Sequence, residues 1–307
     1  MKIQKLVSII CIIIFCTFLL PACSSTFMVI NEPKTMPPAR VLKVKPKVAL
    51  VLGGGAFLGL AHLGALRVLE ENNIQIDLIV GTSAGSFVGA MYADNPDSRS
   101  LTKLAMTVKA ETLFNFSLFN SATGFVSGEN LQKYITDNIK TKNIEDLKIP
   151  FVAVTTDLIS GKTIPLSSGP IAPSINSSCA IPMIFEPVKM YGMTLVDGGV
   201  LDGVAVDIAR SYDPDVIIAI DLMSVVNTNP EVNNFIDVLS RSYQIAAWRI
   251  KHQVIEDADV VLRPKLDKFP LLSDKFNKQI YDAGYEEAKE KIQEIKDVIE
   301  KKVKKEK

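Results

Sequence analysis

The run KVALVL, Lys47 to Leu52, constrains the fold of this chain more than any other feature. Every residue after the lysine is apolar, and three glycines, Gly53 to Gly55, follow at once. A strand with one face in water alternates apolar and polar residues, whereas an unbroken apolar run is typical of a strand buried on both faces of a parallel sheet. Leucines then recur at three-residue steps over residues 59–72, which predicts a helix.

The same alternation continues along the chain. Strands that alternate with helices predict an α/β fold, with a mostly parallel central sheet flanked by helices. Lys and Arg total 34, and so do Asp and Glu, so the charge gives no indication of a nucleic-acid partner. Further strand-type runs are Leu78–Val80, Phe151–Thr155 and Val216–Asp221, and helix-type patterns are Ala84–Tyr92, Glu129–Ile139, Val204–Ser211, Asn234–Glu256 and Lys275–Lys302.

The first residues differ from the body of the chain. Lys2 and Lys5 precede an uncharged apolar run, Leu6–Leu20, and Pro-Ala-Cys follows. This order of positive, apolar and small residues is typical of a secretory signal. The segment resembles a bacterial lipoprotein cleavage box, so we expect a signal peptide over residues 1–22 and a lipidated Cys23. An uncleaved anchor is the alternative, since about 20 apolar residues span a bilayer.

Both interpretations place the body at a membrane surface outside the cytoplasm. Ser24, after the lipidated Cys23, favours the outer membrane or its periplasmic face over the inner membrane. Cys179 is the one cysteine of the body, so no intramolecular disulfide is expected. The prolines between residues 24 and 46 predict an extended tether.

Ser83 stands between two glycines in GTSAGS, where a strand-like run gives way to a helix-like one. Gly-x-Ser-x-Gly at such a junction is the spacing of a nucleophile elbow, a sharp turn that exposes a serine hydroxyl above the sheet. Gly81 and Gly85 are expected where the bend brings backbones too close for a β-carbon. A serine that only caps the following helix is the alternative.

The glycine turn GGGAFLG, directly after the first strand, is a second candidate site. Consecutive glycines let several backbone N–H groups converge without side-chain interference, as an oxyanion hole requires. The dinucleotide-binding fingerprint needs a glycine where this chain has Leu58, so that motif is not present. A tight turn with no role beyond joining strand to helix is the alternative.

A serine nucleophile needs a base, and the chain has two histidines, His62 and His252. Both fall within predicted helices, where His62 is expected to pack or to hydrogen-bond and His252 is expected to be an ordinary, partly exposed residue. Asp197 instead ends a short predicted strand before two glycines, so its carboxylate could accept the hydroxyl proton directly. An aspartate before two glycines is also common in plain turns, and Asp202 and Asp207 are nearby alternatives.

These motifs, taken in order, resemble the patatin-like phospholipases. The resemblance is carried by LVLGGGAFLGLAHLGALRVLEE, then GTSAG, then DGG, with PFVAVTTDLISG and SCAIPMIFEPV between them. It implies a serine lipid acyl hydrolase with a Ser-Asp dyad, no histidine base, no metal and no organic cofactor. The implied substrates are phospholipids or lysophospholipids.

Carried onto this chain, the resemblance makes Ser83 the nucleophile that forms an acyl-enzyme. Asp197 is then the base that activates the serine and later a water molecule. His62 matches a family histidine with a structural role. Leu58 is a departure, because the family often has Arg or Lys there, which leaves a charged contribution to anion binding in doubt. The implied oxyanion donors are the backbone N–H groups of Gly53, Gly54, Gly55 and Ala84.

The resemblance also implies a division of the chain. We expect a signal peptide over 1–22, a lipidated N-terminus and tether over 23–46, a catalytic domain over 47–270, and a C-terminal helix with a Lys-rich tail over 271–307. An acyl site or lid, or simply core, is expected from Phe57, Phe114, Phe116, Leu118 and Phe119.

Two other functions stay open at this level. The chain could be a catalytically weak or silent lipoprotein that binds lipid or a partner at the membrane. It could also be a serine esterase or protease that acts on soluble substrates.

Overall fold

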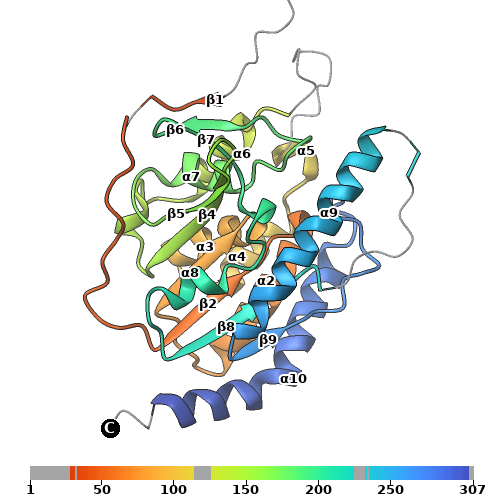
Figure 1. Cartoon of the computed structure of the whole chain (residues 1–307). Coiled ribbons are helices and arrows are strands. Elements are labelled where there is room, and N and C mark those ends of the chain that lie inside the picture. Colours follow the sequence, from red (N-terminus) through yellow and green to blue (C-terminus); the bar gives the residue numbers. More distant parts are fainter. Residues whose placement is uncertain (1–27, 32, 114–125, 225–231, 234, 304–307) are drawn as a thin grey trace, which may run out of the picture.

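The computed structural model describes residues 28–31, 33–113, 126–224, 232–233 and 235–303 (Figure 1). The described strands are β1 (Met28–Val29), β2 (Val48–Leu52), β3 (Leu78–Thr82), β4 (Phe151–Asp157), β5 (Lys162–Leu166), β6 (Val188–Met190), β7 (Met193–Asp197), β8 (Val216–Ile220) and β9 (Val260–Leu262). They form one sheet in the order β1-β6-β7-β4-β3-β2-β8-β9, and β5 pairs with β4.

Most of this sheet is parallel, as the unbroken apolar runs predict. β2 pairs in parallel with β3 on one side and with β8 on the other, and β3 pairs in parallel with β4. β5 and β7 run antiparallel to β4, and β6 and β7 form a hairpin. The arrangement confirms the predicted α/β fold with a mostly parallel central sheet.

Helices cover both faces of the sheet (Figure 1). Leu50 and Leu52 of β2 belong to the core cluster on one face, whereas Ala49 and Val51 belong to the cluster on the other, so every residue of the run is buried. The helices are α2 (Leu60–Glu71), α3 (Ala84–Asp94), α4 (Ser98–Ala105), α5 (Ala110–Leu113), α6 (Glu129–Asn138), α7 (Ile171–Ser178), α8 (Val206–Arg210), α9 (Phe235–Val254) and α10 (Asn277–Val303).

α10 crosses α2 in direct backbone contact. A β-carbon on Gly64 of α2 would lie 2.2 Å from the carbonyl oxygen of Tyr281. One on Gly284 of α10 would lie 2.0 Å from the carbonyl oxygen of Ala61. Since real β-carbons do not approach this closely, the crossing requires glycine on both helices.

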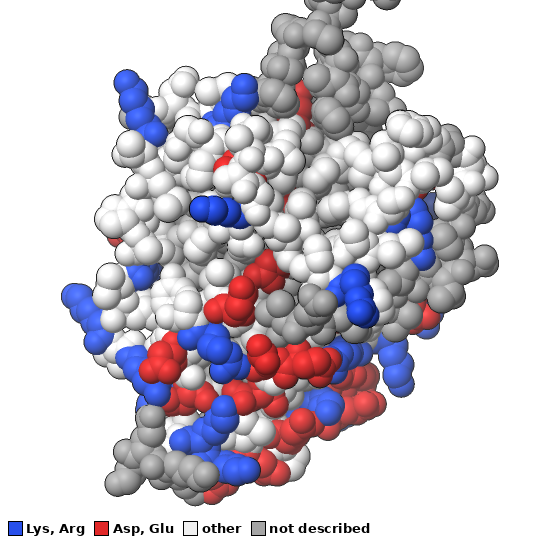
Figure 2. Space-filling model, viewed as in Figure 1, with Lys and Arg blue, Asp and Glu red and all other residues white. Residues whose placement is uncertain are grey.

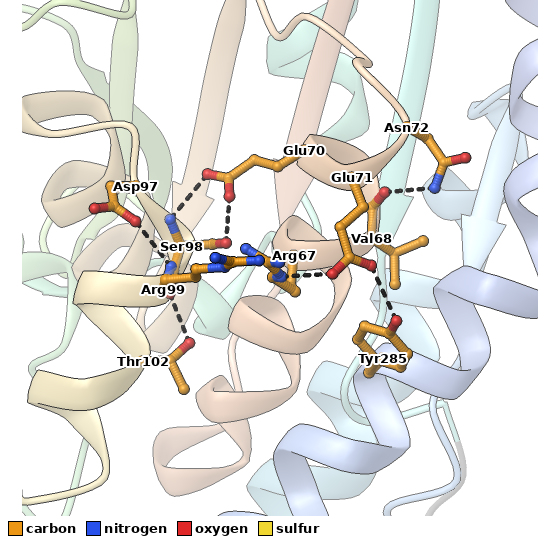
Figure 3. Close-up of polar contacts among 10 residues, drawn as sticks. All are labelled: Arg67, Val68, Glu70, Glu71, Asn72, Asp97, Ser98, Arg99, Thr102 and Tyr285. Atoms are coloured by element: carbon orange, nitrogen blue, oxygen red, sulfur yellow. Dashed lines mark hydrogen bonds and ion pairs between the residues drawn. The ribbon is translucent and has the colours of Figure 1, made fainter.

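Polar contacts at the end of α2 join it to two neighbouring helices (Figure 3). The Tyr285 hydroxyl of α10 donates to Glu71 at 2.9 Å, and the Arg67 guanidinium donates to the same carboxylate at 2.7 Å. Glu70 accepts the backbone N–H of Ser98, the first residue of α4, at 2.8 Å. A carboxylate at the start of α4 also complements the positive end of its dipole.

The described part of residues 28–46 lies against the body. β1 pairs in parallel with β6. The Ser168 hydroxyl donates to the Pro38 carbonyl at 2.7 Å, and the Arg40 N–H donates to the Ser167 hydroxyl at 2.9 Å. Figure 1 shows the segment running down one side of the molecule to β2. It therefore differs from the extended tether that its prolines predict, because its backbone finds hydrogen-bond partners after β5.

The predicted signal peptide, residues 1–22, and the predicted lipidation site Cys23 lie outside the described residues and stay predictions. In the part of the chain that the structure describes, no helix has the length and apolar character needed to cross a membrane.

Candidate active site

Ser83 occupies the sharp turn between β3 and α3. Its backbone has φ 53° and ψ −123°, and such a conformation costs about 1–3 kcal/mol for a residue with a side chain. Its side chain makes no capping hydrogen bond to α3 among the described residues, so the helix-cap alternative does not account for it. A β-carbon on Gly81 would lie 2.5 Å from the Gly85 oxygen, and one on Gly85 would lie 1.9 Å from the Leu52 oxygen. The turn therefore leaves room only for glycine on either side of the serine.

Neighbouring groups hold this strained turn in place. The Ser83 N–H donates to the Ser178 hydroxyl at 3.0 Å, and that hydroxyl donates to the Val154 carbonyl of β4 at 2.6 Å. The Ser86 hydroxyl donates to the Ser83 carbonyl at 2.7 Å. These bonds occupy the backbone of Ser83, so its side-chain oxygen is the group that remains for chemistry.

The sheet brings Asp197 to the same level as Ser83. β4 lies between β3 and β7, with Thr82 paired to Val154 and Thr155 paired to Asp197. The aspartate that ends β7 and the serine that follows β3 are therefore two strands apart, at neighbouring positions along the strands. Both residues line one cavity of about 730 Å³.

Asp197 is a buried carboxylate with one oxygen unused. The residue is 3% exposed, and its Oδ1 accepts the Gly199 N–H at 2.7 Å. Its Oδ2 has no hydrogen-bond partner of standard geometry among the described residues. Burial raises the pKa of Asp197 to about 7, while interaction with the Ser83 hydroxyl and the Gly199 N–H lowers it. The carboxylate is therefore a stronger base than an exposed aspartate, and it lies close enough to Ser83 to be stabilised by its hydroxyl.

The other two acids considered from the sequence, Asp202 and Asp207, do not line this cavity among the described residues. Asp202 is buried, and burial followed by its contact with Asp207 raises its pKa to about 8. Its backbone carbonyl accepts the Thr82 hydroxyl at 3.0 Å. Neither acid is among the described residues that line the cavity with Ser83.

Two of the predicted oxyanion donors in the glycine turn already donate hydrogen bonds to other parts of the backbone. The Gly53 N–H donates to the Ile220 carbonyl of β8, and the Gly54 N–H donates to the Gly203 carbonyl, each at 3.0 Å. The first bond extends the pairing of β2 with β8 beyond Leu52, and the second joins the turn to the loop before α8. As the structure places them, these two N–H groups are engaged and do not serve as oxyanion donors.

The backbone N–H groups of Gly55 and Ala84 are the two predicted oxyanion donors that are not already engaged. Neither has an acceptor among the described residues, and Ala84 is the first residue of α3, where backbone donors are unpaired in any helix. Each lines a space that Ser83 also borders. Gly54 still matters sterically, because a β-carbon there would lie 3.2 Å from the Ser83 β-carbon.

His62 hydrogen-bonds to the glycine turn. It is fully buried, and its Nε2 lies 2.8 Å from the Gly53 carbonyl oxygen. Because a carbonyl only accepts, Nε2 must carry the proton. Burial lowers the pKa of His62 to about 4, so the ring is neutral at physiological pH. The second histidine, His252, lies on α9, and its side chain is outside the described residues.

Two spaces meet at Ser83. A narrow pocket of about 90 Å³ is walled by apolar side chains, among them Phe57, Leu63, Val88 and Phe185. The second space is the 730 Å³ cavity that Asp197 also lines. Of the residues expected at an acyl site, Phe57 lines the narrow pocket. The others lie outside the described residues and stay predictions: Phe114, Phe116, Leu118 and Phe119.

Sequence reasoning missed two other walls of the cavity. Asp221 follows β8 at its carboxyl end, the end of a parallel strand where ligands usually bind, so its position was the available signal. α9 contributes Tyr243 and Trp248 among others. Burial and then the charge of Asp197 raise the pKa of Tyr243, which places that phenol near the Asp197 carboxylate. α9 carries apolar residues on both sides, so its pattern gave a helix without showing which face is buried.

Comparison with known proteins gives a family match. The family model described as "Patatin-like phospholipase" matches residues 50–210. The chain is 31% identical over 277 residues to patatin-like phospholipase domain-containing protein 6 of Homo sapiens, covering 79% of this chain and 20% of that protein. It is 32% identical over 189 residues to lysophospholipase nte1 of Aspergillus fumigatus, covering 60% of this chain and 12% of that protein. The solved structure of VipD from Legionella pneumophila has a TM-score of 0.47 and 13% identity, covering 84% of this chain and 67% of that one.

Proposed function

The chain belongs to the patatin-like phospholipase family, and we propose that it is a lipid acyl hydrolase that cleaves a carboxylic ester bond of a phospholipid or lysophospholipid. The chain spans a fifth or less of the phospholipase and lysophospholipase relatives named above, so their names support the substrate class without fixing it. One observation carries the proposal. A serine held in a strained turn and a buried carboxylate with an unused oxygen line the same cavity.

In the first step the Ser83 Oγ attacks the ester carbonyl carbon, and its proton passes to Oδ2 of Asp197. The raised pKa of this carboxylate, about 7, supports that role, because a general base works best when its pKa is near the working pH. The proton then passes to the leaving alcohol oxygen as the ester C–O bond breaks. The product is an acyl-enzyme on Ser83.

In the second step Asp197 accepts a proton from water, and the hydroxide attacks the acyl-enzyme carbonyl. The proton returns to Ser83 Oγ as the fatty acid leaves. In both steps the carbonyl oxygen becomes negative, and the N–H groups of Gly55 and Ala84 are the donors that remain for it. Removing one such donor costs about 2.7–4 kcal/mol in known hydrolases.

The two spaces at Ser83 suit the two parts of an ester lipid. The narrow apolar pocket accepts the acyl chain next to the scissile carbonyl. The larger cavity, which also holds Arg241 and Lys265 on its walls, accepts the glycerol and headgroup side. Leu58 lines this cavity as well, so the basic residue that the family often has at this position is replaced by an apolar wall.

We further propose that the N-terminal segment anchors the enzyme at a membrane outside the cytoplasm, through a lipid on Cys23. The charge and apolar order of residues 1–22 supports this. The anchor is tested by mass spectrometry of the mature N-terminus, where a diacyl or triacyl group on Cys23 is expected.

Fluorophosphonate labelling and turnover of a water-soluble ester test the catalytic assignment. Ser83→Ala should abolish labelling, because the nucleophile is gone. Asp197→Asn should lower kcat by about 10²–10⁴-fold, the usual contribution of a general base. Asp202→Asn is the matched control, since it removes a buried carboxylate with a similarly raised pKa that does not line the cavity.

Each competing function has its own result in this experiment. A folded wild type that neither labels nor turns over would support a lipid-binding or partner-binding lipoprotein. Equal loss in His252→Ala and Ser83→Ala would assign the base to a histidine. Full activity on soluble esters with no advantage on lysophospholipid micelles would support a soluble-ester hydrolase.

A further inference from the structure

α9 exposes an apolar face where a helix at the surface of a soluble domain is usually polar. Phe235 is 74% exposed, and four other large apolar side chains of the helix are between 37% and 49% exposed. At 100° per residue these positions fall on one stripe, together with Ser242, Ala246 and Arg249. The four are Val238, Leu239, Ile245 and Ile250.

The opposite side of α9 is a wall of the proposed active site. Tyr243, Gln244, Ala247 and Trp248 line the large cavity, and Trp248 donates from its indole N–H to the Ser224 carbonyl at 3.1 Å. The exposed stripe is therefore not the face by which α9 packs on the domain, because the helix packs against the cavity with its opposite face. Its apolar surface needs a separate occupant.

The position of the stripe favours a lipid surface over a protein partner. The amino end of α9 lies in the upper part of Figure 1, the same end of the molecule at which β1 begins the described chain. The uncharged run Leu6–Leu20 precedes β1 in the sequence. Leu272, Lys265 and Asp267, on the cavity wall, are also exposed, so the cavity reaches the surface beside an apolar group and charges of both signs.

Charge supports the same orientation. Figure 2 shows Lys, Arg, Asp and Glu concentrated in the lower part of this view, over α10, whereas the upper part is mostly uncharged. Among the exposed residues described on α9, Arg249 is the one with a charge, and it is positive. A stripe of apolar side chains with a cation and no acid complements the phosphate level and acyl boundary of a bilayer.

We propose that the exposed face of α9 is a membrane-docking surface, which lies in the bilayer interface and presents the cavity to lipid. The inference rests on the proposed function, because a lipid hydrolase must draw its substrate from a bilayer. The N-terminal anchor only keeps the chain near the membrane. α9 sets its orientation, so that the ester enters between the helix and the serine.

Hydrogen exchange on the full chain tests this surface. Ser83→Ala is used as the parent, so that the vesicles of phosphatidylcholine with a minor share of phosphatidylglycerol stay intact. Vesicles should slow exchange of the α9 amides several-fold and leave α10 unchanged. The pair Phe235→Asp and Leu239→Asp should remove this protection. The matched control is the pair Leu158→Asp and Ile159→Asp, two exposed apolar residues of the turn after β4, which should keep it.

An activity measurement complements the exchange result. With Ser83 intact, the pair Phe235→Asp and Leu239→Asp should lower the rate of hydrolysis of lysophospholipid incorporated in the vesicles by about tenfold or more. The reason is that two apolar contacts with the bilayer are lost. Hydrolysis of a water-soluble ester should stay at the wild-type rate. The control pair should change neither rate.

Several results would overturn the docking surface. One is unchanged α9 exchange on vesicles, whether or not the chain binds them. Another is equal loss of protection in both pairs. Concentration-dependent protection of α9 without vesicles would assign the stripe to a second copy of the chain. Failure of the proposed enzyme function is a separate outcome. It would appear as no turnover of the soluble ester by the wild type, and it would not change the hydrogen-exchange result on vesicles.

Discussion

In the proposed mechanism the charge on Asp197 decides when Ser83 can react. Its pKa is raised from the ordinary 3.8 to about 7 by burial, so below that pH the carboxyl is protonated and is too weak a base to take the serine proton. We expect kcat/KM for a soluble ester to rise with pH through about 7 and then level off. A pH profile of initial rates measures this. A rate that already levels off near pH 4 would mean that the base has an ordinary aspartate pKa.

The same residue is expected to cost the fold stability. An acid whose pKa is raised on folding destabilises the native state as pH rises from its unfolded value toward its folded value. Asp197→Asn should therefore raise the free energy of unfolding at neutral pH, by at most about 4 kcal/mol for a shift of some three pKa units. Urea denaturation of the variant and the wild type gives the difference. A variant less stable than the wild type would show that the charge is compensated by contacts that asparagine loses.

At the scale of elements, the crossing of α2 and α10 leaves no room for a side chain. Gly284→Ala places a methyl group against the Ala61 carbonyl, so we expect a loss of about 1–3 kcal/mol and a lower Tm. Lys289→Ala, at an exposed position of the same helix, is the control and should change stability little. An unchanged Tm for Gly284→Ala would mean that the helices separate at little cost.

The elements that sequence reasoning found share one property, which is that their own residues determine them. β2, β3, β4 and β8 are unbroken apolar runs, and no other environment suits such runs better than a buried parallel sheet. β5 was missed because Lys162 and Pro165 interrupt its pattern, and it forms only because β4 offers an antiparallel edge. α7 was missed because serines and a proline are weak helix formers, so packing against β4 and α6 outweighs propensity.

The site divides in the same way. The positions of Ser83 and Asp197 on one cavity were predictable, because each stands in a local motif at the end of a strand. The engagement of the Gly53 and Gly54 N–H groups was not, because it depends on carbonyls about 150 residues further along the chain. The walls supplied by α9 were equally hidden, since a helix with apolar residues on both sides does not show which side a cavity will use.

For the whole molecule, buried titratable groups oppose one another in mild acid. The lowered pKa of His62, about 4, means that the unfolded chain takes up its proton first, so stability falls as pH drops from about 6.5. The raised pKa of Asp197 has the opposite effect over the same range. The raised pKa of Asp202, about 8, acts in the same direction as that of Asp197, so in the wild type the two acids together outweigh the histidine.

Asp197→Asn should bring the histidine contribution closer to balance with the one raised acid that is left, Asp202. We expect the free energy of unfolding of the variant to rise less on mild acidification than that of the wild type. Denaturation curves at neutral and mildly acidic pH provide the comparison, with the free energy of unfolding of His62→Gln expected to rise more on acidification than that of the wild type. Parallel slopes in all three proteins would contradict the assignment.

The hydrogen bonds that anchor the glycine turn also bear on how the protein is made. Gly53 and Gly54 are hydrogen-bonded to Ile220 and Gly203, which leave the ribosome only after Ser83 and Asp197 of the proposed dyad. α10, which packs on α2, emerges later still. A nascent chain that already carries Ser83 and Asp197 therefore lacks the contacts that fix the glycine turn beside them. On the proposed function, we expect such incomplete chains to be inactive and harmless to the membranes of the cell that synthesises them.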